Sequence, residues 1–331
     1  MEKFRAFRLT EADRKIDARF VECTLDDLDP GDVTVRVAYS SVNYKDALAA
    51  TGKGRILRRP SCIGGIDFSG TVMSSTDPRF AKGDAVVTVS GEYVGVSNDG
   101  GYAPFARVSG NWLSKVPRGL SLWEAMALGT AGYTAGVAVA RMEHNGLKPA
   151  NGPVIVSGAT GGVGSVAIAA LAGLGYHVVA LTGKESETDW LKRLGAKEVM
   201  LRSSLDLTRI KPLDKATWSA AVDNLGGPVL AWMASTMKEN GVISAVGLAA
   251  SMELHTSVAP FILRGVSLLG INSGSPSDDI RERVWRRLGS DMKPPLLKEM
   301  ARTLPFRDLP SAFGDFIDGK VSRRIVVDLS E

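Results

Sequence analysis

The chain has 331 residues, of which 44% are hydrophobic and 23% are charged. These values exclude a disordered or fibrous protein, and the length predicts about two domains of roughly 150 residues each. The net charge of +4, from 40 basic and 36 acidic residues, is spread along the chain without a long run of like charges. Nucleic acid is therefore not an expected partner.

Cysteine content and apolar runs indicate where the protein acts. Two cysteines, Cys23 and Cys62, cannot supply a disulfide framework or a four-thiolate zinc site, and we expect both to be reduced. The N-terminus lacks the apolar stretch of a signal peptide. The most apolar run, residues 166–181, is interrupted by two glycines and a histidine, which favours a helix followed by a strand over a membrane span. We therefore expect a cytoplasmic protein without a membrane partner.

The first 115 residues or so are expected to be rich in β-strands. Hydrophobic and polar residues alternate at Val33–Ala38 and Ala85–Val89, and turn clusters such as Asp29–Asp32 separate such segments. The densest basic stretch, Lys53–Arg59, is either a solvated loop or an electrostatic rim that attracts a phosphate-bearing ligand.

The second part of the chain has a different pattern. A capping box formed by Ser121 and Glu124 predicts a helix that ends near Leu128. From about residue 153, short apolar strands alternate with helices, which is typical of a doubly wound parallel sheet and hence of an α/β fold. The strands are expected at residues 154–156, 177–181, 198–201, 220–223, 242–246 and 267–270, and the helices at 163–174, 188–194 and 229–237. A terminal strand, Arg324–Leu329, can return to pair with the first domain.

The segment Ser157–Gly164 lies between a predicted strand and a predicted helix, the context of a dinucleotide-binding turn. Gly161 would let the backbone approach a pyrophosphate, and Gly164 would let the helix lie close to the sheet. Ala159 stands where the usual pattern has its first glycine. The alternative is a glycine turn that only allows close packing. Amides at the start of the helix are the candidate phosphate donors, from Thr160, Gly161, Gly162 and Val163.

The end of the next predicted strand indicates which cofactor is bound. NAD-binding proteins usually place an acidic residue there to accept hydrogen bonds from the ribose hydroxyl. This chain has Thr182, Gly183 and Lys184 instead. Lys184 can attract a 2′-phosphate and Thr182 can donate a hydrogen bond to it, so NADPH is the expected cofactor. The alternatives are that Lys184 is a solvated lysine and that Glu185 turns toward the ribose.

With these residues in view, the chain resembles the medium-chain dehydrogenase/reductase superfamily, in its zinc-free quinone oxidoreductase branch of YhdH/YhfP type, which includes acrylyl-CoA reductases. The resemblance implies a GroES-like β-rich catalytic domain, residues 1–120 completed by about 295–331, and a Rossmann NADPH-binding domain, residues 121–294. It also implies an active site between the two domains and a homodimer. The matching motifs are Ser40–Asp46, Gly65–Gly70, Asp77–Phe80, Gly129–Thr134, the glycine turn and Pro260–Arg264.

No metal is expected. Catalytic zinc needs three protein ligands, and the three histidines, His144, His177 and His255, are isolated from one another in the sequence. Zinc-dependent relatives carry a His-Glu pair where this chain has Ile66 and Asp67. Without a Lewis acid to stabilise an alkoxide, reduction of a quinone or an activated double bond is the better match.

The family's Asn-Tyr motif supplies the candidate catalytic residues. We expect hydride transfer from NADPH to a quinone or to the β-carbon of an α,β-unsaturated carbonyl compound, with charge developing on the carbonyl oxygen. Asn43 would orient that carbonyl, and Tyr44 would contact the nicotinamide or donate the proton. Tyr44 could equally be a packed residue with a satisfied hydroxyl, and solvent could supply the proton. Asp46 is expected to brace the motif rather than to titrate.

Further cofactor contacts are expected along the chain. Thr130 matches a family position near the nicotinamide, and Asn224 would lie beside the adenosine ribose at the carboxyl edge of the sheet. Arg324 would reach a phosphate or form a surface ion pair. The nicotinamide would be lined by residues that end later strands, Gly247, Leu248, Gly270 and Asn272.

The substrate stays open at this point. Acrylyl-CoA reductases of this type usually carry a Glu-Asn-x-Trp-Gly-Gly stretch, whereas this chain has Val96–Gly101, which is closer to the YhfP version. A quinone or enone therefore competes with a CoA thioester, which the basic stretch at Lys53–Arg59 would favour. A third alternative is a protein that binds NADPH and has lost its chemistry.

Overall fold

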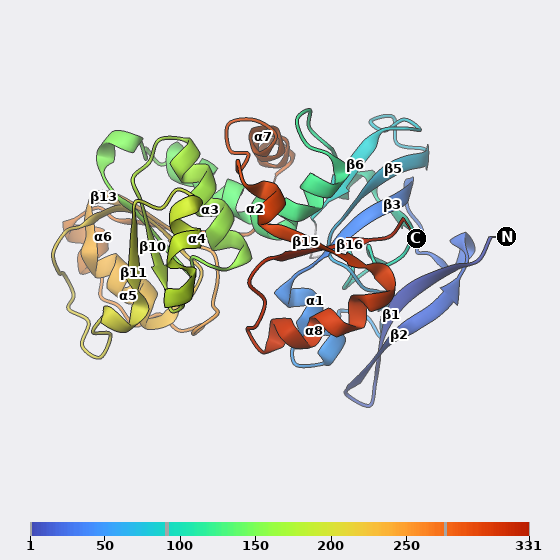
Figure 1. The fold of residues 1–331 in the computed structure, drawn as a ribbon, viewed down its shortest axis with the longest axis horizontal. Helices are drawn as coiled ribbons and strands as arrows, with labels where there is room; N and C mark the ends of the chain where they lie inside the picture. Colours follow the sequence, from blue (N-terminus) through green and yellow to red (C-terminus); the bar gives the residue numbers. More distant parts are fainter. Residues whose placement is uncertain (1, 90–92, 275–276, 331) are drawn as a thin grey trace. The chain divides into compact units, whose positions relative to one another are not determined.

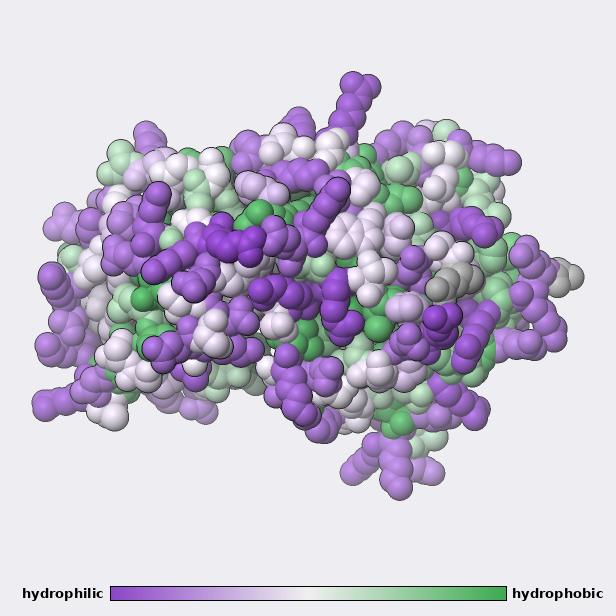
Figure 2. Space-filling view, in the orientation of Figure 1, coloured by the Kyte–Doolittle hydropathy of each residue, from purple (hydrophilic) through white to green (hydrophobic). Residues whose placement is uncertain are grey.

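The structure, a computed structural model, describes residues 2–89, 93–274 and 277–330. The chain forms two compact units (Figure 1). Unit 1 comprises residues 1–130, 274–285 and 297–331, and unit 2 comprises residues 131–273 and 286–296. No helix in the described ranges combines the length and the apolar character that crossing a bilayer requires. Hydrophilic side chains cover most of the face seen in Figure 2.

Unit 1 is built on two sheets. The smaller has the order β2-β1-β4, and the larger has the order β15-β16-β3-β5-β6-β8 with β7 paired to β3. The terminal strand β16 runs antiparallel to β3, so the predicted return of the C-terminus to the first domain is confirmed. The strands are β1 (Phe4–Ala12), β2 (Lys15–Cys23), β3 (Val33–Val42), β4 (Ser61–Ile63), β5 (Phe68–Ser75), β6 (Ala85–Thr88), β7 (Phe105–Val108), β8 (Ser114–Lys115), β15 (Ala301–Pro305) and β16 (Arg324–Asp328).

The core of unit 1 follows from the alternation in its strands. Val33, Val35 and Val37 of β3 are at most 2% exposed, while the side chain of Arg36 is exposed between them. Two helices of this unit, α1 (Tyr44–Thr51) and α8 (Leu309–Ile317), lie side by side (Figure 1). Helix α1 begins directly after β3, so the pairing of β3 in the middle of the large sheet fixes where α1 starts.

Unit 2 is a parallel six-stranded sheet with the order β11-β10-β9-β12-β13-β14. This is the order of the dinucleotide-binding doubly wound fold, and the predicted parallel sheet is confirmed. The strands are β9 (Val154–Ser157), β10 (Val178–Thr182), β11 (Glu198–Leu201), β12 (Trp218–Asp223), β13 (Met237–Ala245) and β14 (Ser267–Gly270). The helices are α3 (Gly162–Gly173), α4 (Thr188–Arg193), α5 (Gly227–Thr236) and α6 (Ala259–Leu263).

Helices α2 (Leu122–His144) and α7 (Asp278–Leu288) contribute residues to both units. The predicted end of a helix near Leu128 agrees with the structure, because Gly129 is non-helical; a second helical part, which was not predicted, follows it to His144. The predicted strand at residues 242–246 is too short, since β13 begins at Met237. The order of the elements is as expected.

Candidate functional site

The Asn43-Tyr44 motif lies where β3 passes into α1. Asn43 is the N-cap of the helix, with extended backbone angles, and the carboxylate of Asp46 accepts a hydrogen bond from the Asn43 backbone N–H at 2.9 Å. Tyr44 is the first helical residue and its side chain is 56% exposed. Within the described part of the chain its hydroxyl has no hydrogen-bond partner. Within unit 1 the Tyr44 side chain is therefore exposed.

Behind this turn lies a buried polar cluster of five residues. The Asn43 amide donates to Asp67 Oδ2 at 3.0 Å and to Asp46 Oδ2 at 3.2 Å, and its oxygen accepts from Arg324 Nη1 at 2.9 Å. Ser41 Oγ donates to Asp67 Oδ1 at 2.8 Å and accepts from Arg324 Nη2 at 2.8 Å. Both ends of the Asn43 amide are thus bound within unit 1.

The position of Arg324 differs most from what the sequence predicts. It is 6% exposed, so the predicted surface ion pair is wrong. Its guanidinium also donates to the carbonyl of Ala127, and with oxygens of three residues around it the group is bound inside unit 1. Arg324 begins β16, and its guanidinium binds Asn43 at the Asn43-Tyr44 turn. We therefore interpret Arg324 as a brace for that turn.

Helix α2 is tied to the same cluster at its break. Gly129 has a φ of +49°, and a Cβ atom there would lie 2.3 Å from Arg324 Nη2 and 2.8 Å from Asp67 Oδ2. Only glycine avoids both the backbone strain and the collision. The Thr130 N–H donates to Asp67 Oδ2 at 2.8 Å, so Asp67 caps the second part of α2. The structure therefore brings Asn43, Thr130 and Arg324 together around one carboxylate.

The cluster holds two buried carboxylates and one buried guanidinium. Burial, and secondly the charge of Asp67, raises the pKa of Asp46 to about 7, although three N–H donors from Asn43 and Ile66 oppose the change. Burial lowers the pKa of Arg324, against the attraction of Asp67 and Asp46. Asp46 braces the turn as expected, and in addition it titrates near neutrality.

This titration predicts a pH dependence. Because the pKa of Asp46 is higher in the folded chain than its usual 3.8, the group stabilises the fold most below about pH 4, and this contribution of a few kcal/mol is lost as the pH rises to about 7. We expect the melting temperature of the wild type to fall more than that of Asp46→Asn between about pH 5 and 8. Asp189→Asn, which removes an exposed carboxylate from α4, is the control. Parallel curves for the wild type and Asp46→Asn would contradict the prediction.

In unit 2 the glycine turn joins β9 to α3. Gly158 has a φ of +58°, so the left-handed position lies one residue before Ala159, whose methyl group is fully buried. A Cβ atom on Gly164 would lie 2.4 Å from the Gly158 carbonyl oxygen, which explains why this position of the helix is a glycine. Gly161 is the N-cap of α3, and the first amides of this helix have no intrahelical acceptor. They supply donors and a positive dipole end for an anion.

Asn224 is fixed beside this turn. Its side-chain amide donates to the Ser157 carbonyl at 2.7 Å and its backbone N–H donates to Ser157 Oγ at 2.9 Å. Asp223, which is fully buried, accepts the Ser157 hydroxyl at 2.7 Å. The Asn224 side-chain oxygen is buried without a hydrogen-bond partner among the described residues. A Cβ atom on Gly247 would lie 2.5 Å from the Asn224 carbonyl oxygen, so these two predicted residues adjoin.

The end of β10 carries the residues expected at a 2′-phosphate. Thr182 is 3% exposed, and its hydroxyl accepts the Lys184 N–H at 3.0 Å. The sequence-based prediction missed Arg202, whose guanidinium lies about 3.5 Å from where a Gly183 side chain would begin. Thr182 pairs with Leu201 in the sheet, so Gly183 and Arg202 leave neighbouring strands at the same edge. The described residues give Arg202 no acidic partner. A basic residue directly after a neighbouring parallel strand was the signal that could have identified it.

The remaining predicted residues of unit 2 follow the ends of β13 and β14. Leu248 is 60% exposed, and Gly270 and Asn272 are exposed as well. A dinucleotide with an extra phosphate fits the residues at this edge of the sheet. They are the unpartnered side-chain oxygen of Asn224, the first amides of α3, and the cations Lys184 and Arg202.

A zinc ion does not fit the residues present. Among the residues that the structure describes, no three histidine, cysteine or acidic side chains are placed to bind a metal. Both carboxylate oxygens of Asp67 already accept hydrogen bonds, and Arg324 puts a positive charge in the same cluster. His177 and His255 contact Glu198 and Glu253 in exposed positions.

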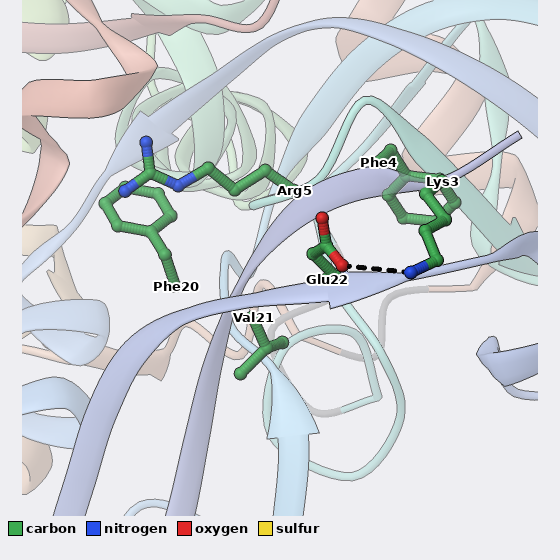
Figure 3. Close-up of a pocket in the computed structure, with 6 residues that line it drawn as sticks. All are labelled: Lys3, Phe4, Arg5, Phe20, Val21 and Glu22. Atoms are coloured by element: carbon green, nitrogen blue, oxygen red, sulfur yellow. Dashed lines mark hydrogen bonds and ion pairs between the residues drawn. The ribbon is translucent and has the colours of Figure 1, made fainter.

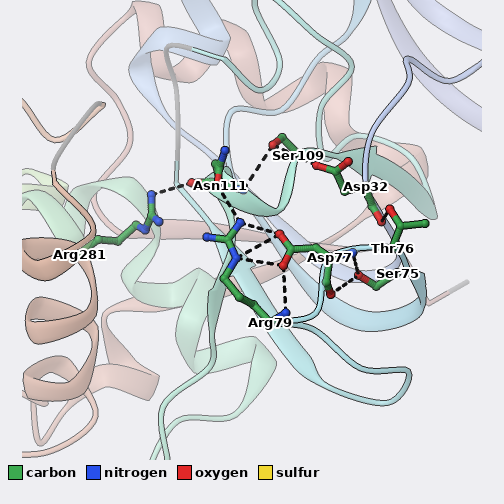
Figure 4. A network of polar contacts seen from close by, with 8 residues as sticks. All are labelled: Asp32, Ser75, Thr76, Asp77, Arg79, Ser109, Asn111 and Arg281. Atoms are coloured by element: carbon green, nitrogen blue, oxygen red, sulfur yellow. Dashed lines mark hydrogen bonds and ion pairs between the residues drawn. The ribbon is translucent and has the colours of Figure 1, made fainter.

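Two other features are not part of this site. A cavity of about 370 Å³ lies on the N-terminal hairpin, where Lys3 pairs with Glu22 and the Arg5 guanidinium stacks on Phe20 (Figure 3). The Asp77–Phe80 motif is structural, because Arg79 pairs with Asp77 and donates to the side-chain oxygen of Asn111 (Figure 4). The backbone carbonyl of Asn111 in turn accepts a hydrogen bond from Arg281 of α7.

Comparison with known proteins agrees with this geometry. Residues 29–118 match the family described as alcohol dehydrogenase GroES-like domain, and residues 162–290 match the one described as zinc-binding dehydrogenase. The chain is 45% identical to the putative quinone oxidoreductase YhfP of Bacillus subtilis, over 98% of this chain and 99% of that protein. It is 44% identical to the acrylyl-CoA reductase AcuI of Ruegeria pomeroyi, over 97% of each.

Solved structures give the same result. The yhdH oxidoreductase of Salmonella enterica, in complex with NADP, has a TM-score of 0.94 at 42% identity and covers 98% of this chain and 99% of its own. The yhfP protein of Bacillus subtilis, with NAD bound, has a TM-score of 0.96 at 43% identity and covers 99% of this chain and 100% of its own. The GroES-like and Rossmann fold classes are thereby confirmed. The chain belongs to the medium-chain dehydrogenase/reductase superfamily, in the group of quinone oxidoreductases and acrylyl-CoA reductases that includes YhfP, AcuI and YhdH.

Proposed function

We propose that the protein is an NADPH-dependent oxidoreductase that transfers hydride, without zinc, to a quinone or to the activated double bond of an α,β-unsaturated carbonyl compound. The observation that carries the proposal is the edge of the unit 2 sheet. There the glycine turn, the unpartnered oxygen of Asn224 and the cations Lys184 and Arg202 occur together, without an acidic residue at the end of β10. The reductases related to this chain support the reaction class.

Different residues of the chain bind different parts of the cofactor. The amides of Thr160, Gly162 and Val163 bind the pyrophosphate, and Asn224 accepts a hydrogen bond from the adenosine ribose. The predicted Gly161 amide already donates to the Gly158 carbonyl at 2.9 Å, so Gly161 serves by its lack of a side chain. The 2′-phosphate lies against Thr182, Gly183 and Lys184, with Arg202 as the second cation. Gly247, Leu248, Gly270 and Asn272 line the nicotinamide, together with Thr130. The reduced nicotinamide supplies the hydride when it is bound.

Unit 1 supplies the groups that act on the substrate. Tyr44, whose hydroxyl is exposed, contacts the nicotinamide end and donates the proton to the developing enolate. The Asn43 amide is already bound to Asp67, Asp46 and Arg324, so we assign Asn43 and Arg324 to holding Tyr44 in place rather than to contact with the substrate or a phosphate.

Tyr44→Phe tests the acid role. Loss of the hydroxyl should lower kcat about 100-fold, in the range found for general acids, while NADPH affinity stays within about twofold. Tyr39→Phe on β3 is the control for the loss of a tyrosine hydroxyl outside the motif. The measurement is the loss of NADPH absorbance in stopped flow. Full turnover by Tyr44→Phe would mean that solvent supplies the proton.

The substrate class has two candidates. A CoA thioester is favoured by the basic stretch that follows α1, because Lys53, Arg55 and Arg58 are exposed, while Arg59 donates to Asp29 at 2.6 Å. Helix α1 has eight residues and so spans about 12 Å, which places this stretch one short helix from Tyr44. Turnover of NADPH with acrylyl-CoA, with an enone and with a quinone distinguishes the candidates. Tight NADPH binding without turnover of any of them would indicate a protein that has lost its chemistry.

We also propose that the protein is a cytoplasmic homodimer. Both described cysteines are free thiols, as expected in a reducing compartment. Strand β14 is an edge of the unit 2 sheet, and apolar side chains near it are exposed. Sedimentation velocity would test the dimer. The exposed apolar residues are Ile262 and Leu263 of α6, which directly precedes β14, and Leu268 of β14 itself.

A further inference from the structure

The second part of α2 carries two polar side chains that reach the same short segment. Thr134, which is 6% exposed in an otherwise apolar stretch, donates its hydroxyl to Ser273 Oγ at 2.7 Å. Arg141 donates to the backbone carbonyl of Gly270. All four residues belong to unit 2, and the two contacts enclose Ile271 and Asn272.

The spacing of the two contacts matches the segment that they hold. Thr134 and Arg141 are seven residues apart, which is about two helical turns, so they lie on one face and about 10 Å apart along the axis. Gly270 and Ser273 are three residues apart, which is also about 10 Å in an extended chain. Between the two contacts, the Ala138 carbonyl accepts from Ser244 Oγ of β13 at 3.3 Å. The segment therefore runs along one face of α2 and is attached at both ends.

This segment comes directly after β14, at the carboxyl edge where a parallel sheet of this type binds its ligand. On its other side the Ile271 N–H donates to the Ala245 carbonyl at 3.0 Å, at the end of β13. Gly270 and Asn272 stay exposed between these attachments. The contacts thus fix the backbone while leaving one face of the segment open to a ligand.

We propose that Thr134 and Arg141 are positioning residues that hold the segment Gly270–Asn272 against the nicotinamide end of the cofactor. The proposal rests on the proposed function. A reacting group that moves by about 1 Å can lose about 100-fold in rate, so two hydrogen bonds that fix this segment contribute to hydride transfer without touching the cofactor. The adenosine end, which is held by the glycine turn and the 2′-phosphate residues, should not depend on them.

Thr134→Val tests whether the two ends of the cofactor depend differently on this contact, because valine keeps the volume of threonine and removes its hydroxyl. Calorimetry would compare the Kd of NADPH with that of 2′-phospho-ADP-ribose, which lacks the nicotinamide. We expect NADPH to bind about fivefold more weakly, as expected for one lost hydrogen bond, and the fragment to bind within about twofold of wild type. Single-turnover hydride transfer should slow about 10-fold, and Thr134→Ser should restore both values.

Thr236→Val is the matched control, since Thr236 is also a buried hydroxyl of unit 2, bonded to the Trp232 carbonyl at 2.9 Å. It should leave the ratio of the two Kd values at the wild-type value. If Thr134→Val fails to fold, Ser273→Ala removes the same bond from the other side and should change the ratio in the same way. An unchanged ratio in a folded variant would overturn the inference alone, whereas failure of the wild type to bind NADPH would overturn the proposed function.

Discussion

Replacement of Arg324 by methionine should lower the midpoint of thermal unfolding by about 10 °C. The side chain of Arg324 is the buried cation beside Asp67 and Asp46, and it also bonds to the Asn43 amide. Removal of one partner from a buried charge cluster costs about 3–5 kcal/mol, because the other charges stay buried without compensation. A domain of this size loses about 2–4 °C for each kcal/mol. Differential scanning fluorimetry would measure the change.

A neighbouring arginine provides the control for Arg324→Met. Arg323 donates to the Ser322 carbonyl beside it and is outside the cluster, so Arg323→Met should change the midpoint by less than about 2 °C. Adding Asp67→Asn to Arg324→Met removes one of the two carboxylates left in the cluster and should recover part of the loss. Equal midpoints of unfolding for Arg324→Met and Arg323→Met would show that Arg324 does not brace the Asn43-Tyr44 turn.

Gly164→Ala should weaken NADPH binding at least about 100-fold. The new Cβ atom would lie 2.4 Å from the Gly158 carbonyl oxygen and 2.9 Å from the Ala159 Cα, and both are backbone atoms that cannot rotate away. The turn must therefore open, which moves the helix amides that we propose for the pyrophosphate. A loss of two to three hydrogen bonds to a charged group corresponds to this factor. Quenching of protein fluorescence by NADPH would measure the affinity.

Helix α3 contains its own control. Gly173 lies in the last turn and its backbone is helical; outside the helix, the one atom of the described residues within 4 Å of an added Cβ is the Asp291 carbonyl oxygen, at 3.9 Å. Gly173→Ala should keep wild-type affinity and raise stability slightly, since alanine favours the helix by about 1 kcal/mol. Wild-type affinity of a folded Gly164→Ala variant would remove the glycine turn from the proposed cofactor site.

The sequence predicts unit 2 well for a physical reason. Its central strands β9, β10 and β12 are buried on both faces, so they are continuous apolar runs, and the glycine turn between β9 and α3 has a fixed steric requirement at Gly164. Parallel strands end at one edge, which is why Asn224 and Gly247 could be placed at the carboxyl ends of their strands. Arg202 was missed because its place depends on which strands are neighbours, and the pairing of Thr182 with Leu201 is not evident from spacing.

The buried cluster of unit 1 could not be predicted in this way. Arg324 is separated from Asn43 by 281 residues, and no local pattern distinguishes a buried arginine from one on the surface. The resumption of α2 after Gly129 has the same origin, because Asp67, which caps it at Thr130, comes from the segment just before β5. The family motif identified Asn43 and Tyr44 as candidate catalytic residues, but the partners of the Asn43 amide come from tertiary structure.

Calorimetric titration with NADPH and with NADH, on the same wild-type protein, is the most direct measurement of the proposed function. Lys184 and Arg202 should make NADPH bind at least about 10-fold more tightly, since a charge-assisted contact is worth about 1.5–3 kcal/mol. The proposal is contradicted if the two cofactors bind equally well, or if neither binds.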